Sequence, residues 1–493
     1  MAAAALALAM SYPAIAADSA PQPQGDMSTE IQSLKARLEQ LENQQKQAEQ
    51  HRQEAEQKLD AKVTADQLSH DATNSDNHFL TAEGFTAGYS DGRFVVQSAD
   101  GNFTWRPWLH FQFRDVVEDR ADRLGKGSHI SDEVDNGFEA RRMRFGFDGN
   151  MWSPDFTYFF NWTTSRASGN TSVSGATPSA TGGSVTASNN LGGVPVLEEA
   201  WLAYHIPTTS WSVKLGQQHD PIIHEEMTSS RYRHSAEISL TGDIFVNGDA
   251  FTEGAFLIYD AHRNLRVEAG VNHGMRSANT NFLDYPNNGG FNAFDYGIAG
   301  RAEWKFFGRW KDYGQVGAVD TKEPLLVVGV GGDYSERGRD GQAVAATDAM
   351  YADQNGLLLY GEFVDRYTTH NFGAYTQSGV GASIITPDPA VAGKPTNEYS
   401  ILMEGGYIIN HRIEPFARYE FMHLQGDAAG SHNWINVVTG GVNYYFHGHR
   451  LKATLQAMWL PQGLPFDDSP SDELASPGGH REIDFEAQIQ FIL

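Results

Sequence analysis

The carboxyl-terminal segment of the chain alternates between apolar and polar side chains. Its apolar members are Ile483, Phe485, Ala487, Ile489, Phe491 and Leu493, and the residues between them include Asp484, Glu486, Gln488 and Gln490. On an extended strand this period of two places one apolar face opposite one polar face. A strand of this length suits the wall of a membrane β-barrel, which meets lipid on one side and water on the other. The alternative, an edge strand of a β-sandwich, stands only if the pattern does not recur upstream.

The same alternation recurs along most of the chain, for example in 109–114, 265–272, 413–421 and 451–459. Such segments are about ten residues long, which is the length that a tilted strand needs to cross a bilayer. The pattern predicts the following strands: 93–98, 103–117, 138–149, 155–163, 196–205, 211–218, 253–260, 264–272, 296–307, 324–334, 357–366, 371–384, 399–409, 412–422, 434–446, 450–460 and 482–493.

The first of these segments is the shortest, and bacterial single-chain barrels have an even number of strands. We therefore expect 93–98 to lie outside the wall and the rest to form an all-β, 16-stranded antiparallel transmembrane β-barrel. A barrel of about this size encloses a water-filled channel. The longer polar segments 164–195, 219–250, 273–295, 335–356 and 461–481 are expected to be outer loops. The stretch 167–193, rich in Ser, Thr, Gly and Asn, either protrudes or folds into the channel.

Composition supports this fold class. The chain has 50 Gly, 28 Phe, 19 Tyr and 10 Trp, which suit tight turns and the aromatic girdles of a barrel. Its mean hydropathy is −0.45, and no internal apolar run of about eighteen residues predicts a membrane-spanning helix. The absence of Cys excludes disulfides, catalytic thiols and thiolate metal sites.

The amino-terminal part differs in composition from the barrel. Residues 1–16 resemble the apolar core and cleavage site of a secretory signal peptide, although no basic residue precedes Lys35, so we expect the true start to lie upstream of Met1. A short linker, 17–27, follows. Apolar residues at heptad spacing in 28–68 predict a periplasmic helical, coiled-coil-like segment, with a solvated single helix or a disordered linker as the alternative. Residues 69–92 are expected to be a linker, and 93–493 the barrel.

Five motifs, in order along the chain, resemble those of the phosphate-selective porin O and P family. They are the F-x-x-R-R-x-R pattern at 138–144, the LEEAWLAY strand at 197–204, the stretch from Leu215 to Ser230, the G-Y-x-x-x-x-R-x-E-P-x-A-R-Y region at 406–419, and the G-x-N-Y-Y hairpin from Gly441 to Lys452. The resemblance implies a trimeric outer-membrane porin with sixteen strands, through which anions diffuse passively. Phosphate and polyphosphate are the solutes implied by the family.

The phase of the apolar faces selects the basic residues that point into the channel. These candidate pore-lining and anion-binding residues are Arg142, Arg144, Arg114, Lys214, Arg266, Arg301, Lys305, Arg418 and Lys452. A guanidinium group presents a rigid fork of donors that matches the oxygens of phosphate. The alternative is that these charges pair with acids predicted to face inward as well, namely Asp148, Glu199, Glu268, Glu303 and Glu420. Among the bases, Arg142 and Arg144 are the favoured filter residues.

Net charge leaves a second function open. The chain has 62 acidic and 36 basic residues, a formal net charge of −26, which weakens long-range attraction of anions. A general or sugar-permeable porin of weak ion selectivity is therefore the main alternative. In that case Trp105, Trp108, Trp162 and Trp201 offer stacking faces, unless they are girdle residues. A plugged barrel that serves as a structural tether is a further alternative.

No enzymatic motif is complete in this sequence. His224-Glu225-Glu226 begins like a zinc-binding HExxH motif but lacks the second His, and there is no nucleophile elbow or phosphate-binding loop. His432, His447 and His449 are more typical of a solvated turn than of a metal site. We therefore expect no enzyme activity, cofactor or nucleic-acid partner. The expected partners are outer-membrane lipid, small hydrophilic solutes and two further copies of the chain, in the outer membrane of a Gram-negative bacterium.

Overall fold

The computed structural model describes residues 80–82, 84–90, 93–120, 134–164, 195–246, 251–261, 263–275, 277–279, 294–337, 340–369, 394–425, 433–463 and 481–493. The predicted signal peptide at 1–16, the linker at 17–27 and the helical segment at 28–68 lie outside these residues. Within the described residues, no helix has the length and hydropathy that a membrane span requires.

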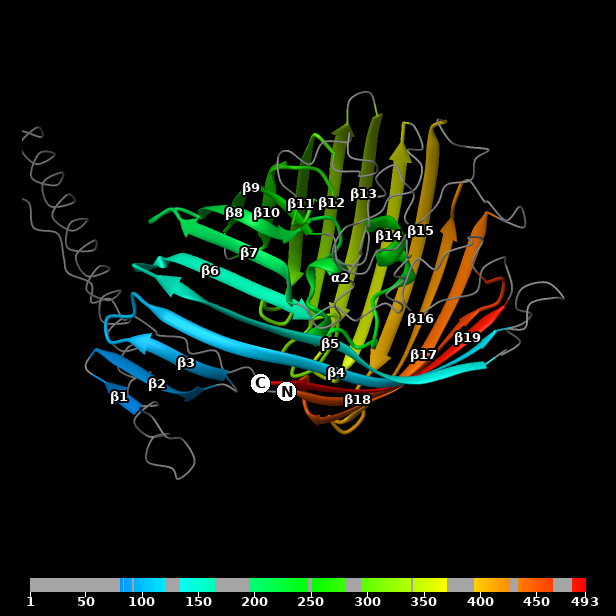
Figure 1. Ribbon diagram of the computed structural model, residues 1–493, viewed down its shortest axis with the longest axis horizontal. Coiled ribbons are helices and arrows are strands. Elements are labelled where there is room, and N and C mark those ends of the chain that lie inside the picture. Colours follow the sequence, from blue (N-terminus) through cyan, green and yellow to red (C-terminus); the bar gives the residue numbers. More distant parts are fainter. Residues whose placement is uncertain are drawn as a thin grey trace, which may run out of the picture. The chain divides into compact units, whose positions relative to one another are not determined.

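Sixteen antiparallel strands form a closed barrel (Figure 1). They are β4 (Thr104–Arg120), β5 (Val134–Met151), β6 (Ser153–Thr164), β7 (Pro195–His205), β8 (Trp211–His219), β9 (Phe251–Asp260), β10 (Leu265–Asn272), β11 (Tyr296–Phe307), β12 (Leu325–Arg337), β13 (Asp340–Ala352), β14 (Leu357–Thr368), β15 (Thr396–Tyr407), β16 (Ile413–His423), β17 (Trp434–His447), β18 (Leu451–Leu460) and β19 (Glu482–Ile492). Each pairs with its neighbour in sequence, and β19 closes the wall on β4, from Glu482 opposite Arg120 to Ile492 opposite His110. The predicted fold class is thus confirmed for the barrel.

Three short strands precede the barrel. They are β1 (Leu80–Ala82), β2 (Phe85–Ser90) and β3 (Arg93–Ser98). β3 pairs with β4 only at Val96 and Gln97, so it extends the sheet outside the closed wall as predicted. The predicted linker at 69–92 was wrong in its last part, because β1 and β2 form a hairpin there.

The strand count of sixteen is correct, but one member was misplaced. Residues 335–356, predicted as an outer loop, contain β13, which pairs with β12 along its whole length. The segment 371–384, predicted as a strand, lies outside the described residues, and β14 pairs directly with β15. β13 shows no clear apolar–polar alternation, since its inner face mixes apolar residues such as Val344 and Met350 with the polar Asp348, while its outer face is rich in alanine.

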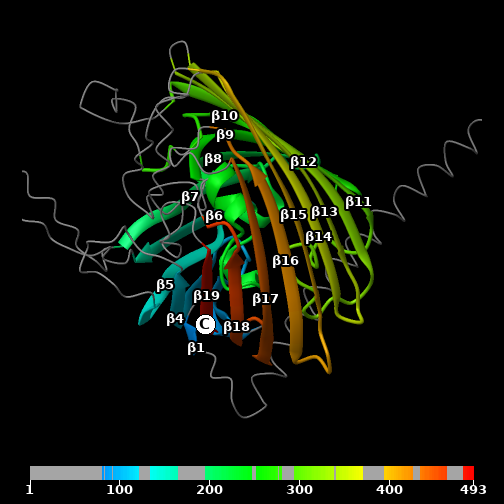
Figure 2. The same cartoon turned by 90° about the vertical axis from the view of Figure 1, so that its right-hand side faces the viewer.

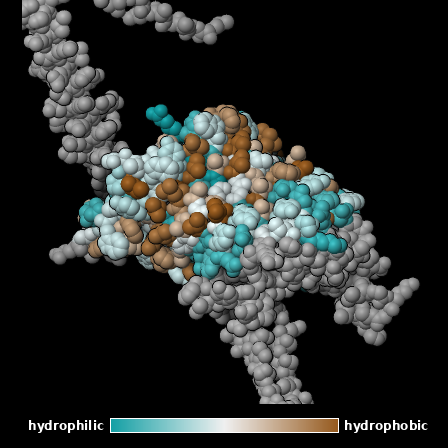
Figure 3. Space-filling view, turned by 90° about the horizontal axis from the view of Figure 1, so that it is seen from above, coloured by the Kyte–Doolittle hydropathy of each residue, from teal (hydrophilic) through white to brown (hydrophobic). Residues whose placement is uncertain are grey.

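The two faces of the wall differ in polarity, as the period of two requires. Large apolar residues that point outward, such as Leu215, Ile298 and Leu455, are more than half exposed. Inward neighbours such as Arg114, Arg418 and Lys452 are nearly fully buried. Brown, hydrophobic side chains gather on the face visible in Figure 3. The outer face therefore suits lipid and the inner face suits a polar lumen.

Two links fold into the barrel instead of leaving it. The first, 220–246, joins β8 to β9 and contains α2 (His224–Met227), the 3₁₀ turn η1 (Ser230–Tyr232) and the π turn η2 (Gly242–Val246) (Figure 2). The prediction that 219–250 is an outer loop is corrected for these residues. Ile222, Ile244 and Phe245 pack with Val364 and Val437 of the inner wall, so apolar contacts keep the segment inside.

The second inward link, 308–324, joins β11 to β12. Tyr313 and Val316 pack against Leu325, Met350 and Leu358 of the inner wall. The two links meet where Arg233 forms a parallel bridge with Val316. We call 220–246 the constriction segment, because its side chains contact the arginines of the wall.

Candidate functional site

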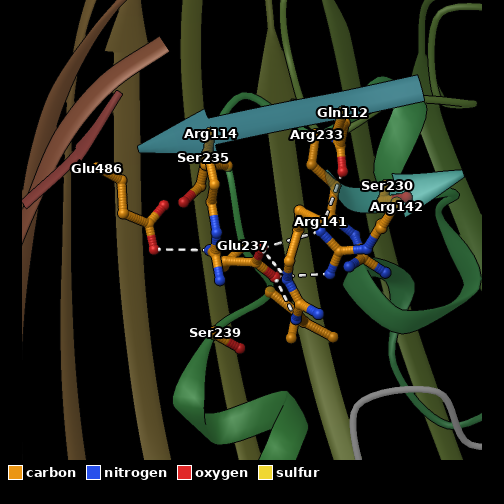
Figure 4. A network of polar contacts seen from close by, with 12 residues as sticks. Gln112, Arg114, Arg141, Arg142, Ser230, Arg233, Ser235, Glu237, Ser239 and Glu486 are labelled. Atoms are coloured by element: carbon orange, nitrogen blue, oxygen red, sulfur yellow. Dashed lines mark hydrogen bonds and ion pairs between the residues drawn. The ribbon is translucent and has the colours of Figure 1, made fainter. Parts of the chain in front are cut away.

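Glu237 of the constriction segment forms ion pairs with three arginines of the wall (Figure 4). Arg142 reaches Glu237 with both terminal nitrogens, at 3.0 and 2.6 Å. Arg141 donates to the same carboxylate through Nε at 2.6 Å and Nη2 at 3.1 Å. Nη1 of Arg114 lies 3.0 Å from Oε1 of Glu237. Charge-assisted, partly bidentate contacts of this kind fix geometry strongly, so Glu237 anchors the constriction segment to the wall.

Two further acids compensate the same cluster. Arg114 pairs with Glu139 of β5 and, at 2.9 Å, with Glu486 of β19. Three guanidinium groups therefore face three carboxylates. The cluster is close to neutral as a whole, although its positive groups lie on β4 and β5 and its central negative group, Glu237, lies on the constriction segment.

A β-bulge explains why consecutive arginines both point inward. On β4, Gln112 lies opposite Arg142, while Arg114 lies opposite Glu139, so one extra residue is inserted in β5. A bulge shifts the strand phase by one residue. Before the bulge the odd-numbered residues of β5 point inward, and Arg141 is the last of them. After the bulge the even-numbered residues point inward, and Arg142 is the first of them.

Arg144 forms a separate contact one step along the same strand. Its Nε lies 2.7 Å from Oε1 of Glu198, and its Nη1 donates to Ser230 Oγ at 2.5 Å. Glu198 also accepts from Asn161 at 2.9 Å. A second bulge, where Asn161 faces Glu199 and Trp162 faces Leu197, frees Glu198 for this inward role. Arg142 and Arg144, the two favoured residues, thus both hold the constriction segment.

The other seven predicted residues are spread around the wall. Arg114 joins the Glu237 cluster, and the remaining six make separate contacts. Lys214 pairs with Glu268 at 2.8 Å, Arg266 with Asp260 at 3.0 Å, Arg301 with Asp348 at 2.7 Å and Arg418 with Glu420 at 3.0 Å. The Nζ of Lys305 donates to the carbonyl of Gly308 at 2.5 Å, and that of Lys452 to the carbonyl of Arg233 at 2.8 Å. Pairing, the alternative weighed from the sequence, therefore describes most of these residues.

Sequence reasoning missed several residues of the site. Arg141 was missed because phasing assumes an unbroken strand, and Glu237 because its segment was read as an outer loop. Arg231 and Arg233, also on the constriction segment, are buried. The charged residues between Ser230 and Glu237 were the one sequence feature that indicated a role for this segment. The local sequence does not show which residues of the wall they pair with.

The electrostatics of Glu237 follow from its arginines. Burial alone would raise the pKa of the Glu237 carboxyl, but Arg141, Arg142 and Arg114 outweigh burial and hold the pKa well below its ordinary value of 4.5. Glu237 therefore stays ionised, and its contacts persist, at mildly acidic pH.

A pH dependence of stability follows. Because the folded pKa is lower than the unfolded one, the contribution of Glu237 is fully present above pH 4.5 and is lost as pH falls through the folded pKa. We expect Glu237→Gln to lower the thermal unfolding temperature at pH 7, and this difference from wild type to shrink well below pH 4.5. If Glu237→Gln lowers the unfolding temperature by the same amount at pH 7 and at pH 3, the proposed contribution of the Glu237 charge is contradicted.

Histidines singled out from the sequence make contacts with neighbouring side chains of the barrel. Among the described residues, no group of three or more His, Asp and Glu is placed to hold a metal ion. His224 stacks on Tyr313 with a ring distance of 3.8 Å, and His449 contacts Gln315 at 2.8 Å. His432 lies outside the described residues.

Comparison with known proteins agrees with this geometry. The family model described as phosphate-selective porin O and P matches residues 128–306, which include three of the five motifs and both bulges. The resemblance inferred from the sequence is therefore confirmed over this part of the chain. Porins are channels and not enzymes, in agreement with the expectation from the motifs. A search of curated proteins finds no match to the sequence.

Several solved outer-membrane porins are similar to this chain in structure at low sequence identity. An anion-selective porin from Comamonas acidovorans has a TM-score of 0.50 at 9% identity, covering 79% of this chain and 100% of that porin. OmpF of Salmonella typhi, in complex with daunomycin, has a TM-score of 0.49 at 13% identity, covering 79% of this chain and 98% of OmpF. The channel DcaP of Acinetobacter baumannii has a TM-score of 0.43 at 10% identity, covering 80% of this chain and 99% of DcaP. At these identities the likeness concerns the fold alone.

Proposed function

We propose that this barrel, whose residues 128–306 match the phosphate-selective porin O and P family, is an outer-membrane channel for passive diffusion of small anions such as phosphate. The observation that carries the proposal is the placement of Arg114, Arg141 and Arg142 on one side of the lumen, where the constriction segment narrows it. Arginines of this kind replace the hydration shell of a phosphate in steps. An arriving anion competes with Glu237 for these donors.

The resemblance also supports a trimer, and the heptad spacing of apolar residues in 28–68 supports an amino-terminal segment in the periplasm. The apolar outer face of the wall, with exposed residues such as Leu215 and Ile298, supports insertion in a bilayer. Chemical crosslinking of the detergent-solubilised protein tests the trimer. A ladder that ends at the monomer would contradict it.

A general porin of weak selectivity remains the second candidate, and pairing favours it. Arg144, Arg301 and Arg418 each have a carboxylate partner within 3.0 Å. Paired charges cancel much of the field that an ion in the lumen would feel. The anion channel and the general porin differ in ion preference, and both require a continuous water-filled path through the barrel.

The first experiment asks whether the path is open. We expect purified protein to produce stepwise conductance in a planar bilayer and to let an uncharged sugar swell liposomes. The constriction segment and the link 308–324 both lie inside the wall, so a plugged barrel is the competing outcome. The complete absence of conductance and swelling, from protein whose heat-modifiable mobility shows a folded barrel, would reject the channel in favour of a structural tether.

A further inference from the structure

Three aromatic rings stack in a row along the inner wall, near the end where the links between strands are short. Trp108 of β4 and Phe159 of β6 have ring centroids 6.1 Å apart with an interplanar angle of 29°. Phe159 and Trp201 of β7 are 5.6 Å apart at 12°. Trp108 shares the inward phase of His110 and Gln112, and Phe159 that of Asn161. We call these three near-parallel rings the aromatic floor.

A glycine in the intervening strand makes room for the floor. A Cβ on Gly146 of β5 would lie 2.7 Å from Cζ2 of Trp108 and 2.4 Å from the carbonyl oxygen of Phe160. Any side chain there would therefore displace the indole of Trp108 or the strand β6. Phe159 and Trp201 are only partly buried, so ring surface remains accessible from the lumen.

Arginines surround the floor. Arg231 of the constriction segment places its guanidinium carbon 3.8 Å from the centroid of Trp108. Arg93 of β3 and Arg106 of β4 line, with the floor, a cavity of about 360 Å³. Their one carboxylate neighbour in the lining is Asp148, which pairs with Arg106 and, at 3.4 Å, with Arg93.

Arg231 is the least compensated of these arginines. Its side chain is buried, and its Nε donates to Ser229 Oγ at 3.1 Å. Within the described parts of the chain, no carboxylate lies within 4.0 Å of its nitrogens. Three guanidinium groups and one carboxylate therefore line the cavity, in contrast to the balanced cluster at Glu237. The excess positive charge selects an anionic group.

We propose that this cavity binds a sugar phosphate, with the phosphate on Arg231, Arg93 and Arg106 and one face of the sugar ring on Phe159 and Trp201. Free phosphate would gain nothing from the aromatic rings, and an uncharged sugar would gain nothing from the excess positive charge. Asp148 lies among the arginines, where it accepts hydrogen bonds from sugar hydroxyls. An aromatic carboxylate would also combine a ring with a negative charge, but it has no hydroxyl group to donate to Asp148. The proposal deepens the proposed function, on which it rests, by adding a class of solute.

The test compares three probes on the purified full-length protein in detergent by isothermal titration calorimetry. We expect glucose 6-phosphate to bind about tenfold more tightly than inorganic phosphate or glucose, the equivalent of one good ring-face contact. Equal affinities for glucose 6-phosphate and inorganic phosphate would overturn the proposal. The comparison uses wild-type protein alone, so it does not depend on the folding of any variant.

Two variants assign the contributions. Trp201→Leu should lower the affinity for glucose 6-phosphate to that for inorganic phosphate, whereas Trp201→Phe, which keeps a ring, should retain most of it. Arg231→Gln should lower the affinity for glucose 6-phosphate toward that for glucose, with Arg93 and Arg106 still in place. Trp304→Leu, on the outer face of β11, is the matched control and should change nothing. Unchanged binding in Trp201→Leu would remove the floor from the site.

The outcome for the channel is separate from this one. Open conductance combined with no preference for glucose 6-phosphate would reject the sugar-phosphate site and leave the channel standing. Preferential binding without any conductance would reject diffusion through the channel and leave the binding site standing.

Discussion

Replacing Glu237 with Gln is expected to make the channel markedly more selective for anions. The substitution leaves Arg114, Arg141 and Arg142 without their shared carboxylate. One unit charge about 6 Å from a passing ion, through water, is worth about 0.7 kcal/mol. Because the anion gains and the cation loses this energy, the anion-to-cation permeability ratio should rise roughly tenfold at low salt. The rise should be smaller above about 0.1 M salt, where screening is strong.

The measurement is the reversal potential in a chloride gradient, wild type against variant. Glu336→Gln is the matched control, because its carboxylate accepts hydrogen bonds from Tyr296 and Tyr334 on the outer face. It removes the same charge without touching the lumen. If both variants shift the reversal potential equally, the effect belongs to net charge and the constriction role of Glu237 is rejected.

The second large effect is expected from the double substitution of Arg142 and Arg144 with Gln. It removes two positive charges and leaves Glu237 and Glu198 with fewer partners. Leaving one partner of a buried ion pair uncompensated costs about 3–5 kcal/mol in a fully buried site. We therefore expect selectivity to shift at least tenfold toward cations and the constriction segment to loosen, while the sixteen-stranded wall still forms.

Two readouts separate these effects. The reversal potential reports selectivity, and limited proteolysis between Ser230 and Gly242 reports release of the constriction segment. The double control is Arg263→Gln with Arg412→Gln, two exposed residues on short links between strands, away from the site. A reversal potential that is unchanged in the Arg142 and Arg144 variant would remove both residues from the filter.

The barrel wall was readable from the sequence wherever one face meets lipid and the other meets water. β18 and β19 alternate cleanly, and their predicted bounds agree with the structure to within one residue. β13 was missed because its inner face mixes apolar residues, which pack on the inward links, with polar ones such as Asp348, while its outer face is mostly alanine. Periodicity reports the contrast between two faces, so a strand whose two faces differ little in polarity gives no clear alternation.

The candidate site was predicted only in part, for a different reason. Phase alone placed Arg142 and Arg144 inward, but the bulges that add Arg141 and Glu198 to the inner face shift the phase locally. The partner Glu237 is separated from Arg142 by 95 residues and comes from a segment that looks like an ordinary polar loop. A long-range contact of this kind depends on how the link packs inside the wall, which local pattern does not encode.

The most direct test of the central claim is the reversal potential of the wild-type channel in a planar bilayer with a chloride gradient, repeated after phosphate is added. The claim is that lumen arginines dominate ion passage although the chain carries a net charge of −26. We expect a reversal potential that favours anions, with a chloride current that falls as phosphate occupies the arginines. A reversal potential that favours cations, with a current indifferent to phosphate, would contradict the account.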